Sequence, residues 1–507
     1  MEETASSDRI SQGDSSGPPG DADTEEIWSQ QNLLSLDGGG IRGYWTLLVL
    51  RQLMILVAVE ERKKDCPSPE DYHSFHPHTF PVHAARPLRT GLVLIRGTRF
   101  PLWKTVISFF HVIILTISAD QVLGGKQFRM TVLDCLYEYR KMGNKIFGKP
   151  RLISQPNTGI ITRFKYSASA MEDAFREVTA RRCEEIEHRI KEVTFPSMPG
   201  LCRTFVTTKK KERTKDSKGS EEKLYLIRSY DHEKSDPHHL GRQAATNLST
   251  KAVQTNYGPA HPLEIWEVAR AATAAPMYFE KIRFERKSAT ECTKISFTDG
   301  GFGYTNNPIN KGLSEIKSLH GKSSIGVVVS VGTAKAKEYH AGRSLRKQVR
   351  KIANVATDPE VAEEHVDDDL AHYFRFNDDK GMSIDLDEWR PNGLFTKNPG
   401  WKTIDTMEHA FNKWCNNPEN TKHMKSCAKE LVRRRRIRIK DSARWQRYAT
   451  GARFVCGHAG CVFDPQYDRE VFKTHLLSEH HADPGEVDNL IRRMTKFWKY
   501  QNIPHQG

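Results

Sequence analysis

Short apolar runs alternate with longer helix-like stretches along most of this chain, which predicts strands that alternate with helices. The stretches typical of helices span residues 44–61, 129–139, 168–188 and 262–273. The runs typical of strands span residues 33–36, 204–207, 224–230, 295–298 and 325–333. Because the last of these runs is almost continuously apolar, it predicts a strand that is covered on both faces. The pattern as a whole predicts an α/β fold.

The segment after the first predicted strand is unusually rich in glycine, and reads Asp37-Gly38-Gly39-Gly40-Ile41-Arg42-Gly43. A glycine turn at a helix N-terminus exposes backbone N–H groups, which favour an anion. One interpretation is a dinucleotide-binding turn of the form G-x-G-x-x-G, yet no second strand follows before the charged residues 60–64. A second is an oxyanion hole formed by the amides of Gly39 and Gly40. The third is a turn without a ligand.

A second glycine turn follows the strand predicted at 295–298. Asp299 ends that strand and is followed by Gly300 and Gly301. An aspartate in this position can act as a general base when a partly dry pocket raises its pKa. The alternative is a turn aspartate that caps its own backbone.

Four segments, in this order, resemble the motifs of the patatin-like phospholipases, in particular the long cytosolic type of filamentous fungi. They are residues 37–43, 269–279, 299–301 and 306–308, and the resemblance extends over roughly residues 30–340. It implies a three-layer α/β fold with a mostly parallel central sheet, and hydrolysis of acyl esters by a Ser–Asp dyad. It also implies the amides of Gly39 and Gly40 as oxyanion donors and Asp299 as the base. Arg42 would fix the loop or meet a lipid phosphate.

The Gly-x-Ser-x-Gly elbow that carries the nucleophile in that family has no match at the expected place. The family has a strand, the elbow and a helix where this chain has the atypical residues 82–128. The apolar run at 106–117 is shorter than a membrane span and predicts a buried strand or helix, with a membrane anchor as the alternative. A match to the elbow at 13–17 lies in polar sequence, without the strand and helix that an elbow needs.

We therefore assign no nucleophile, and we expect this chain to have little or no activity. Loss of resemblance between two matched flanks is typical of an altered exon boundary or a retained intron, and evolutionary loss of the nucleophile is the alternative. A form with the elbow would hydrolyse acyl esters of phospholipids or neutral lipids. The competing hypothesis is a non-catalytic protein that binds lipid or a protein partner.

The C-terminal region carries a second chemical signal. Cys456, Cys461, His475 and His480 follow the spacing C-x4-C-x13-H-x4-H, which is typical of a structural Cys2His2 zinc site. His481 could replace His480 as the fourth ligand. No cofactor is expected for the hydrolysis itself.

A run of arginines at 433–436, with Arg438, lies upstream of these ligands. A zinc finger beside a basic segment is typical of nucleic-acid binding, but one finger reads only ~3 base pairs. For the arginines, the alternative is the exposed face of a helix. We favour a zinc-stabilised structural or protein-interaction module over nucleic-acid binding.

Composition and charge set further limits. The 507 residues carry a net charge of +14, which permits peripheral contact with an anionic membrane surface, and a solvated basic surface is the alternative. Lysines 209–211, at the start of a charged loop predicted at 209–223, could meet lipid headgroups. Nine cysteines without a disulfide pattern favour a reducing compartment, and we identify no secretory signal, so we expect a cytoplasmic protein.

These observations divide the chain into four predicted parts. Residues 1–28 form a disordered tail, 29–342 an acyl hydrolase domain, 343–448 a helical extension and 449–507 the zinc module. The boundaries follow shifts in composition, from a polar tail to an apolar α/β pattern and then to mainly helical sequence.

Overall fold

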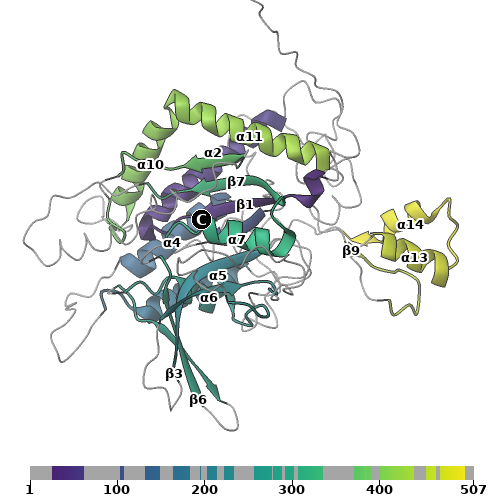
Figure 1. Ribbon diagram of the computed structural model, residues 1–507, viewed down its shortest axis with the longest axis horizontal. Coiled ribbons are helices and arrows are strands. Elements are labelled where there is room, and N and C mark those ends of the chain that lie inside the picture. Colours follow the sequence, from purple (N-terminus) through teal and green to yellow (C-terminus); the bar gives the residue numbers. More distant parts are fainter. Residues whose placement is uncertain are drawn as a thin grey trace, which may run out of the picture.

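The computed structural model describes residues 26–61, 103–107, 132–148, 164–182, 195, 203–213, 222–232, 256–276, 278–287, 292–301, 306–334, 370, 372–382, 384–389, 400–438, 453–463 and 469–496. These residues form a mixed α/β body with helices on both faces of one sheet, and a small C-terminal module that lies apart from it (Figure 1). The tail predicted at 1–28 lies outside the described residues up to residue 25.

Within the described residues, the main sheet has eight strands, of which five run parallel. In their order across the sheet, the parallel strands are β8 (Tyr373–Phe376), β7 (Ile325–Val331), β1 (Gln31–Leu36), β2 (Trp103–Ile107) and β3 (Thr204–Arg213). Three strands join antiparallel at the β3 side: β4 (Lys223–Arg228), β6 (Cys292–Asp299) and β5 (Ile282–Lys287).

Two hydrophobic cores lie on the two faces of this sheet. The larger core includes helices α2 (Gly43–Glu61), α4 (Val132–Phe147), α5 (Ala168–Arg182), α6 (Ile265–Ala272), α10 (Trp401–Cys415) and α11 (Pro418–Arg438). The smaller core packs under α7 (Ile309–His320). Neighbours such as Leu33 and Leu34 of β1 belong to different cores, because successive side chains of a strand point to opposite faces.

The elements predicted from the apolar pattern are confirmed where the structure describes them. The five predicted strands correspond to β1, β3, β4, β6 and β7, and the four predicted helices to α2, α4, α5 and α6. Strand β7 contributes to both cores, as its continuous apolar run predicted. In the atypical segment, β2 contains the first two residues of the apolar run at 106–117, and the rest of that run lies outside the described residues.

The prediction of a charged loop at 209–223 is wrong for residues 209–213 and for Lys223, which belong to strands. Residues 209–213 continue β3 and Lys223 begins β4, and β3 pairs with both β4 and β6. The backbone can pair in spite of the polar sequence, because long lysine side chains keep their charged ends in water. The segment predicted to be a helical extension also contributes β8, which pairs with β7 in the main sheet.

The arginines of α11 are not an exposed helix face, and that hypothesis is wrong for three of them. Arg434, Arg435 and Arg438 are each at most 5% exposed. Arg438 donates to the backbone carbonyls of Ile27 at 3.0 Å and Gln30 at 2.8 Å, and Arg434 donates to the side-chain oxygen of Gln30 at 2.5 Å. These arginines therefore fasten the segment before β1 to α11.

Helix α2 forms the centre of the larger core. Residues 40–60 are long and apolar enough to cross a membrane, and 61% of that apolar window is buried inside the fold. The side chains from 44 to 50 are fully buried, and the helix packs against α4, α10 and α11. A helix that protein covers on several sides is expected to be apolar around most of its circumference.

A buried ion pair joins β4 to α7. Arg228 donates from Nε and Nη2 to the carboxylate of Glu315, at 2.7 and 2.8 Å, and the Tyr230 hydroxyl donates to the same carboxylate at 2.7 Å. Both charged side chains are at most 3% exposed. Loss of one partner would leave the other charge buried and unpaired, which is strongly destabilising.

We predict that Arg228→Met lowers the free energy of unfolding by about 3–5 kcal/mol. The measurement is urea denaturation followed by tryptophan fluorescence. The double variant Arg228→Met/Glu315→Leu should recover much of this loss, because it also removes the unpaired carboxylate. A single variant as stable as the unmodified protein would contradict this role of the pair.

Candidate functional site

Strands β2 and β6 share one edge of β3. Residues 205–206 of β3 pair with both β2 and β4, and residues 208–210 pair with both β4 and β6. A strand has only two edges, so β4 occupies one of them and β2 and β6 occupy the other. Because β2 runs parallel to β3 and β6 runs antiparallel, the carboxyl ends of β2 and β6 face each other.

The gap between these two strand ends is one residue of β3 long. Ile107, at the end of β2, pairs with Val206, and Asp299, at the end of β6, pairs with Thr208. A Cβ atom on Gly300 would lie 2.5 Å from the backbone of Thr207. The chain can therefore turn through this gap after Asp299 only because residue 300 is glycine.

The glycine loop after β1 reaches the same place, because β1 pairs with β2 up to the ends of both strands. Several of its amides are used within the fold: those of Gly38, Ile41 and Arg42 donate to the carbonyls of Asn306, Leu386 and Gly39, at 2.9, 2.8 and 3.0 Å. The amides of Gly39 and Gly40 donate to none of the described residues. Both glycines line a pocket, so their amides are available to an anion there.

A buried ion pair fixes the start of this loop. The carboxylate of Asp37 is fully buried and accepts two hydrogen bonds from the guanidinium of Arg375 on β8, at 2.6 and 3.0 Å. Arg375 also donates to the hydroxyl of Ser330 at 2.8 Å. A bidentate arginine–carboxylate pair restrains orientation as well as distance, so the loop leaves β1 in one direction.

Two glycines of the loop are required by their surroundings. A Cβ atom on Gly39 would lie 2.3 Å from the hydroxyl oxygen of Thr333. Gly40 has a φ of 55°, which glycine adopts without strain, and its carbonyl accepts a hydrogen bond from the Tyr139 hydroxyl at 2.5 Å. The loop backbone is therefore held close to its neighbours.

Asp299 is buried beside the loop, with only 5% of its surface exposed. Burial raises the pKa of its carboxyl group to about 7, although the Gly301 amide and the charge of Lys209 act in the opposite direction. The Gly301 amide donates to Oδ1 at 2.7 Å. A carboxyl group with a pKa near neutrality can both accept and donate a proton at cellular pH, as a general base must.

A pocket of about 440 Å³, counted with its open mouth, lies between the glycine loop and Asp299. Its polar wall consists of Gly38, Gly39, Gly40, Asp299, Gly301, Asn306 and Asp387. Its apolar wall consists of Phe147, Ala275, Tyr278, Phe279 and Leu386. An apolar wall that faces convergent polar groups is typical of a small-molecule site.

Arg42 lies behind the loop and does not line this pocket. It is 4% exposed, its Nη1 donates to the carbonyl of Ala334 at 3.1 Å, and burial lowers its pKa to about 10. Gly43 begins α2, and its amide donates to the carbonyl of Gly40. Of the two roles considered for Arg42, these contacts fit the fixing of the loop.

The nucleophile remains unassigned. The described residues that line the pocket include no serine, threonine or cysteine. The residues that follow β2, where the family resemblance implies the elbow, lie outside the described residues.

Two polar residues of the site carried no signal in the sequence. Arg375 is 338 residues from Asp37, and no motif connects them. Asp387 lines the pocket, where it accepts hydrogen bonds from Lys165 and, at 2.9 Å, from the Tyr166 hydroxyl. Side chains that meet across such separations can be paired only when the fold is known.

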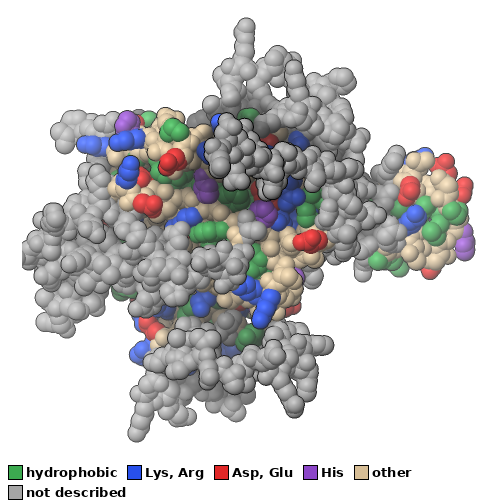
Figure 2. Space-filling model, turned by 45° about the horizontal axis from the view of Figure 1, so that its top comes forward, with side chains coloured by type: hydrophobic (Ala, Val, Ile, Leu, Met, Phe, Trp, Pro, Cys, Tyr) green, Lys and Arg blue, Asp and Glu red, His purple; other side chains and the backbone are tan. Residues whose placement is uncertain are grey.

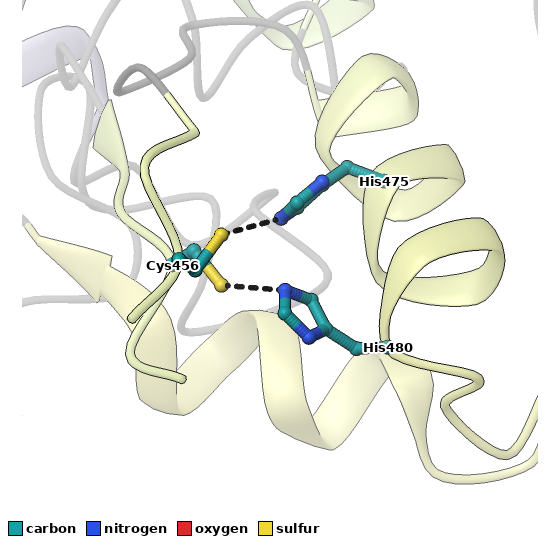
Figure 3. A group of neighbouring side chains, drawn as sticks. Cys456, His475 and His480 are labelled. Carbon is teal, nitrogen blue, oxygen red and sulfur yellow. Dashed lines mark hydrogen bonds between the residues drawn. The ribbon is translucent and has the colours of Figure 1, made fainter. Parts of the chain in front are cut away.

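The four predicted metal ligands come together in the C-terminal module. The module consists of β9 (Arg453–Phe454), α13 (Arg469–Glu479), α14 (Val487–Met494) and β10 (Thr495–Lys496), and β9, α13 and α14 contribute to its small core. The imidazoles of His475 and His480 point towards the cysteine sulfurs (Figure 3). The distances are 3.3 Å from Cys456 Sγ to His480 Nε2 and 3.4 Å from Cys461 Sγ to His475 Nε2.

This donor set fits one metal ion. One ligand atom from each residue lies within 4.8 Å of all the others. Tetrahedral zinc, with bonds of about 2.0–2.3 Å, brings its ligand atoms to roughly 3.3–3.8 Å from one another. His481 is exposed and is not part of the group, so the geometry selects His480 as the fourth donor.

The described residues form a mixed α/β fold with a pocket between the glycine loop and Asp299. Comparison with known proteins shows a distant similarity to a phospholipase A2. No family model matches the chain. The relative is the calcium-independent phospholipase A2-gamma of Oryctolagus cuniculus, a patatin-like phospholipase, to which the chain is 24% identical over 389 residues. The match covers 75% of this chain, which spans about two-fifths of that protein's length, 39%. The fungal type stays a prediction.

We predict that Asp299→Asn is more stable than the unmodified protein at pH 8 and differs little from it at pH 4.5. The pKa of Asp299 is about 7 in the folded state and about 3.9 in the unfolded chain. The folded state therefore binds a proton that the unfolded chain has released, so this group's contribution to stability is lost as the pH rises from about 4 to 7.

The measurement is the midpoint of urea denaturation at the two pH values. Asp405→Asn is the matched control, because Asp405 is exposed on α10 and does not line the pocket. The control should shift the midpoint equally at both pH values. An equal shift for Asp299→Asn would contradict the raised pKa.

Proposed function

We propose that this protein, in a form that carries the nucleophile elbow, is a cytoplasmic lipid acyl hydrolase of the patatin-like type, which acts on acyl esters of phospholipids or neutral lipids at membrane surfaces. The observation that carries the proposal is that the buried Asp299 and the amides of Gly39 and Gly40, which donate to none of the described residues, meet around one apolar-walled pocket. The distant similarity to a phospholipase A2 supports the same class of reaction.

In this mechanism the acyl chain lies along Phe147 and Phe279, and the ester carbonyl oxygen points at the two amides. The serine of that elbow attacks the carbonyl carbon through its hydroxyl oxygen, and its proton passes to the carboxylate of Asp299. The amides of Gly39 and Gly40 stabilise the negative charge that develops on the carbonyl oxygen. Asp299 then protonates the departing alcohol, and water cleaves the acyl-serine ester by the same steps.

A second candidate function is non-catalytic lipid binding, with the C-terminal module recruiting a protein partner. The absence of a Gly-x-Ser-x-Gly elbow from residues 82–128 favours it. In this case the pocket would hold a long-chain carboxylate, with its head on the amides of Gly39 and Gly40 and its chain along the apolar wall.

Labelling of the full chain with a fluorophosphonate separates the two candidates. For the hydrolase we expect one labelled serine, together with release of fatty acid from phospholipid vesicles. Asp299→Asn should slow that release by about 10²–10⁴-fold, because it removes the base, whereas Asp405→Asn should leave the rate unchanged.

Absence of labelling, with a folded protein that still binds fatty acid, would overturn the hydrolase proposal and support the binding protein. Peptide mass spectrometry of the native protein across residues 80–130 adds an independent check. Peptides that contain Gly-x-Ser-x-Gly would show that the native chain has the elbow, and peptides that match residues 105–126 would show that the atypical segment is genuine.

For the C-terminal module we propose a structural zinc ion held by Cys456, Cys461, His475 and His480. The buried core of the module is small, and consists of Phe454, Phe472, Leu476, Val487 and Ile491. A core of this size rarely folds alone, and bound zinc supplies the missing stability. The module has no nucleic-acid role in this proposal, because the nearby arginines Arg434, Arg435 and Arg438 are buried in α11.

We predict that the purified protein contains one zinc ion per chain and that Cys456→Ser removes most of it. Elemental analysis measures the metal, and limited proteolysis should detect cleavage between residues 453 and 496 in the variant. Cys292→Ser is the control, because Cys292 lies on β6, outside the group of four donors. A folded, protease-resistant module without metal would contradict the proposal.

A further inference from the structure

The outer ends of β3, β5 and β6 carry a row of cationic side chains on one face. Pairing places Lys211 opposite Ser296 and Arg213 opposite Lys294, and Arg283 pairs with Ser296 from the other side. Directly opposite residues share a face of the sheet, and residues two apart along a strand do too. We call this surface the basic face; it consists of Lys209, Lys211, Arg213, Arg283 and Lys294.

The other face of the same strands packs into the larger core. Ile295 and Phe297 of β6 and Ile282 of β5 are at most 9% exposed and belong to that core. They alternate with Lys294, Ser296 and Arg283 along the strands. The basic face is therefore the side that points away from the larger core, and Figure 1 shows the ends of β3 and β6 extending beyond the helices.

The outermost cations of this face are open to solvent. The side chains of Lys294 and Arg283 are 70% and 59% exposed, and Arg213 is exposed as well. Two described carboxylates accompany these cations: Glu285 lies 3.7 Å from Lys294, and Glu280 forms an ion pair with Arg283. The cations outnumber these carboxylates, so the face carries a net positive charge.

The basic face begins at the level of Asp299 along β3. Lys209 follows Thr208, which pairs with Asp299, and its charge lowers the pKa of that carboxyl group. Arg213 lies five residues beyond Thr208, or about 17 Å along the strand. The face thus extends from the level of Asp299 to the outer end of β3. Figure 2 shows Lys and Arg side chains at several places on the visible surface of the described residues, some of them near acidic side chains.

We propose that the basic face docks the protein on an anionic lipid bilayer. The inference rests on the proposed function, since a hydrolase of membrane lipids must hold its pocket near the bilayer. Charge complementarity identifies the occupant, because phosphate and carboxylate headgroups present an anionic surface to this cationic one. Salt should weaken the contact, because the charges are exposed.

The test is co-sedimentation of the full chain with vesicles of ether-linked phosphatidylcholine, with and without 30% phosphatidylserine. Ether lipids cannot be hydrolysed as acyl esters, so binding is measured whether or not the chain is a hydrolase. The variant is Lys211→Glu/Arg213→Glu/Lys294→Glu, in which Lys209 is left unchanged because its charge acts on Asp299. We expect roughly 100-fold weaker partitioning onto the anionic vesicles, with no change on neutral ones.

The matched control is Lys422→Glu/Lys425→Glu/Lys429→Glu, which makes the same change of charge at three exposed positions of α11. It should bind anionic vesicles within a few-fold of the unmodified protein. A second variant with glutamine at positions 211, 213 and 294 should give a smaller loss, which guards against misfolding caused by charge reversal. Thermal unfolding verifies that each variant is folded.

Three outcomes would overturn the proposal. The first is equal loss of vesicle binding in the control, which would indicate only a general effect of net charge. The second is undiminished binding by a folded basic-face variant. The third is salt-sensitive binding to a duplex oligonucleotide, lost in the basic-face variant while vesicle binding is kept, which would make this face a nucleic-acid surface.

Discussion

The shared edge of β3 is the constraint on which the candidate site depends. One edge of this strand pairs first with β2, from one direction, and then with β6, from the other. The carboxyl ends of β2 and β6 must then face each other along β3. Strand β1 brings the glycine loop to the same level through its pairing with β2. Parallel strands direct the loops at their carboxyl ends to one side of a sheet, where ligands bind. The fold therefore creates the pocket before any side chain is considered.

Burial then decides what the polar groups at this junction can do. The Asp37 carboxylate is paired with Arg375, so its charge is compensated and serves to hold the loop. Asp299 has only a backbone amide and a more distant lysine to favour its charged form, so burial keeps its pKa high. Asp37 and Asp299 thus differ in their electrostatic surroundings, because Asp37 has a bidentate arginine partner and Asp299 does not.

Much of the fold was readable from the sequence, since apolar periodicity reports which faces are covered. The apolar run of β7 and the glycine turns after β1 and β6 were identified correctly for this reason. The lysines at 209–211 predict a loop by their charge, but the prediction is wrong, because β3 continues to pair through these residues. Their long side chains allow the charged ends to stay in water. The buried arginines of α11 and the pair of Asp37 with Arg375 depend on contacts between distant segments, which no local pattern encodes.

Strand β2 shows that the fold needs less from the sequence of this segment than the proposed chemistry does. A strand in this position needs only apolar, pairing-competent residues, and residues 103–107 meet that need although the surrounding sequence is atypical. A nucleophile elbow needs one serine with small residues around it, and other residues cannot replace them. The sheet can therefore form, and the glycine loop and Asp299 can come together, without a serine elbow after β2. The pocket is consequently a property of the fold, whereas the proposed catalysis also needs a serine, which the family resemblance implies after β2.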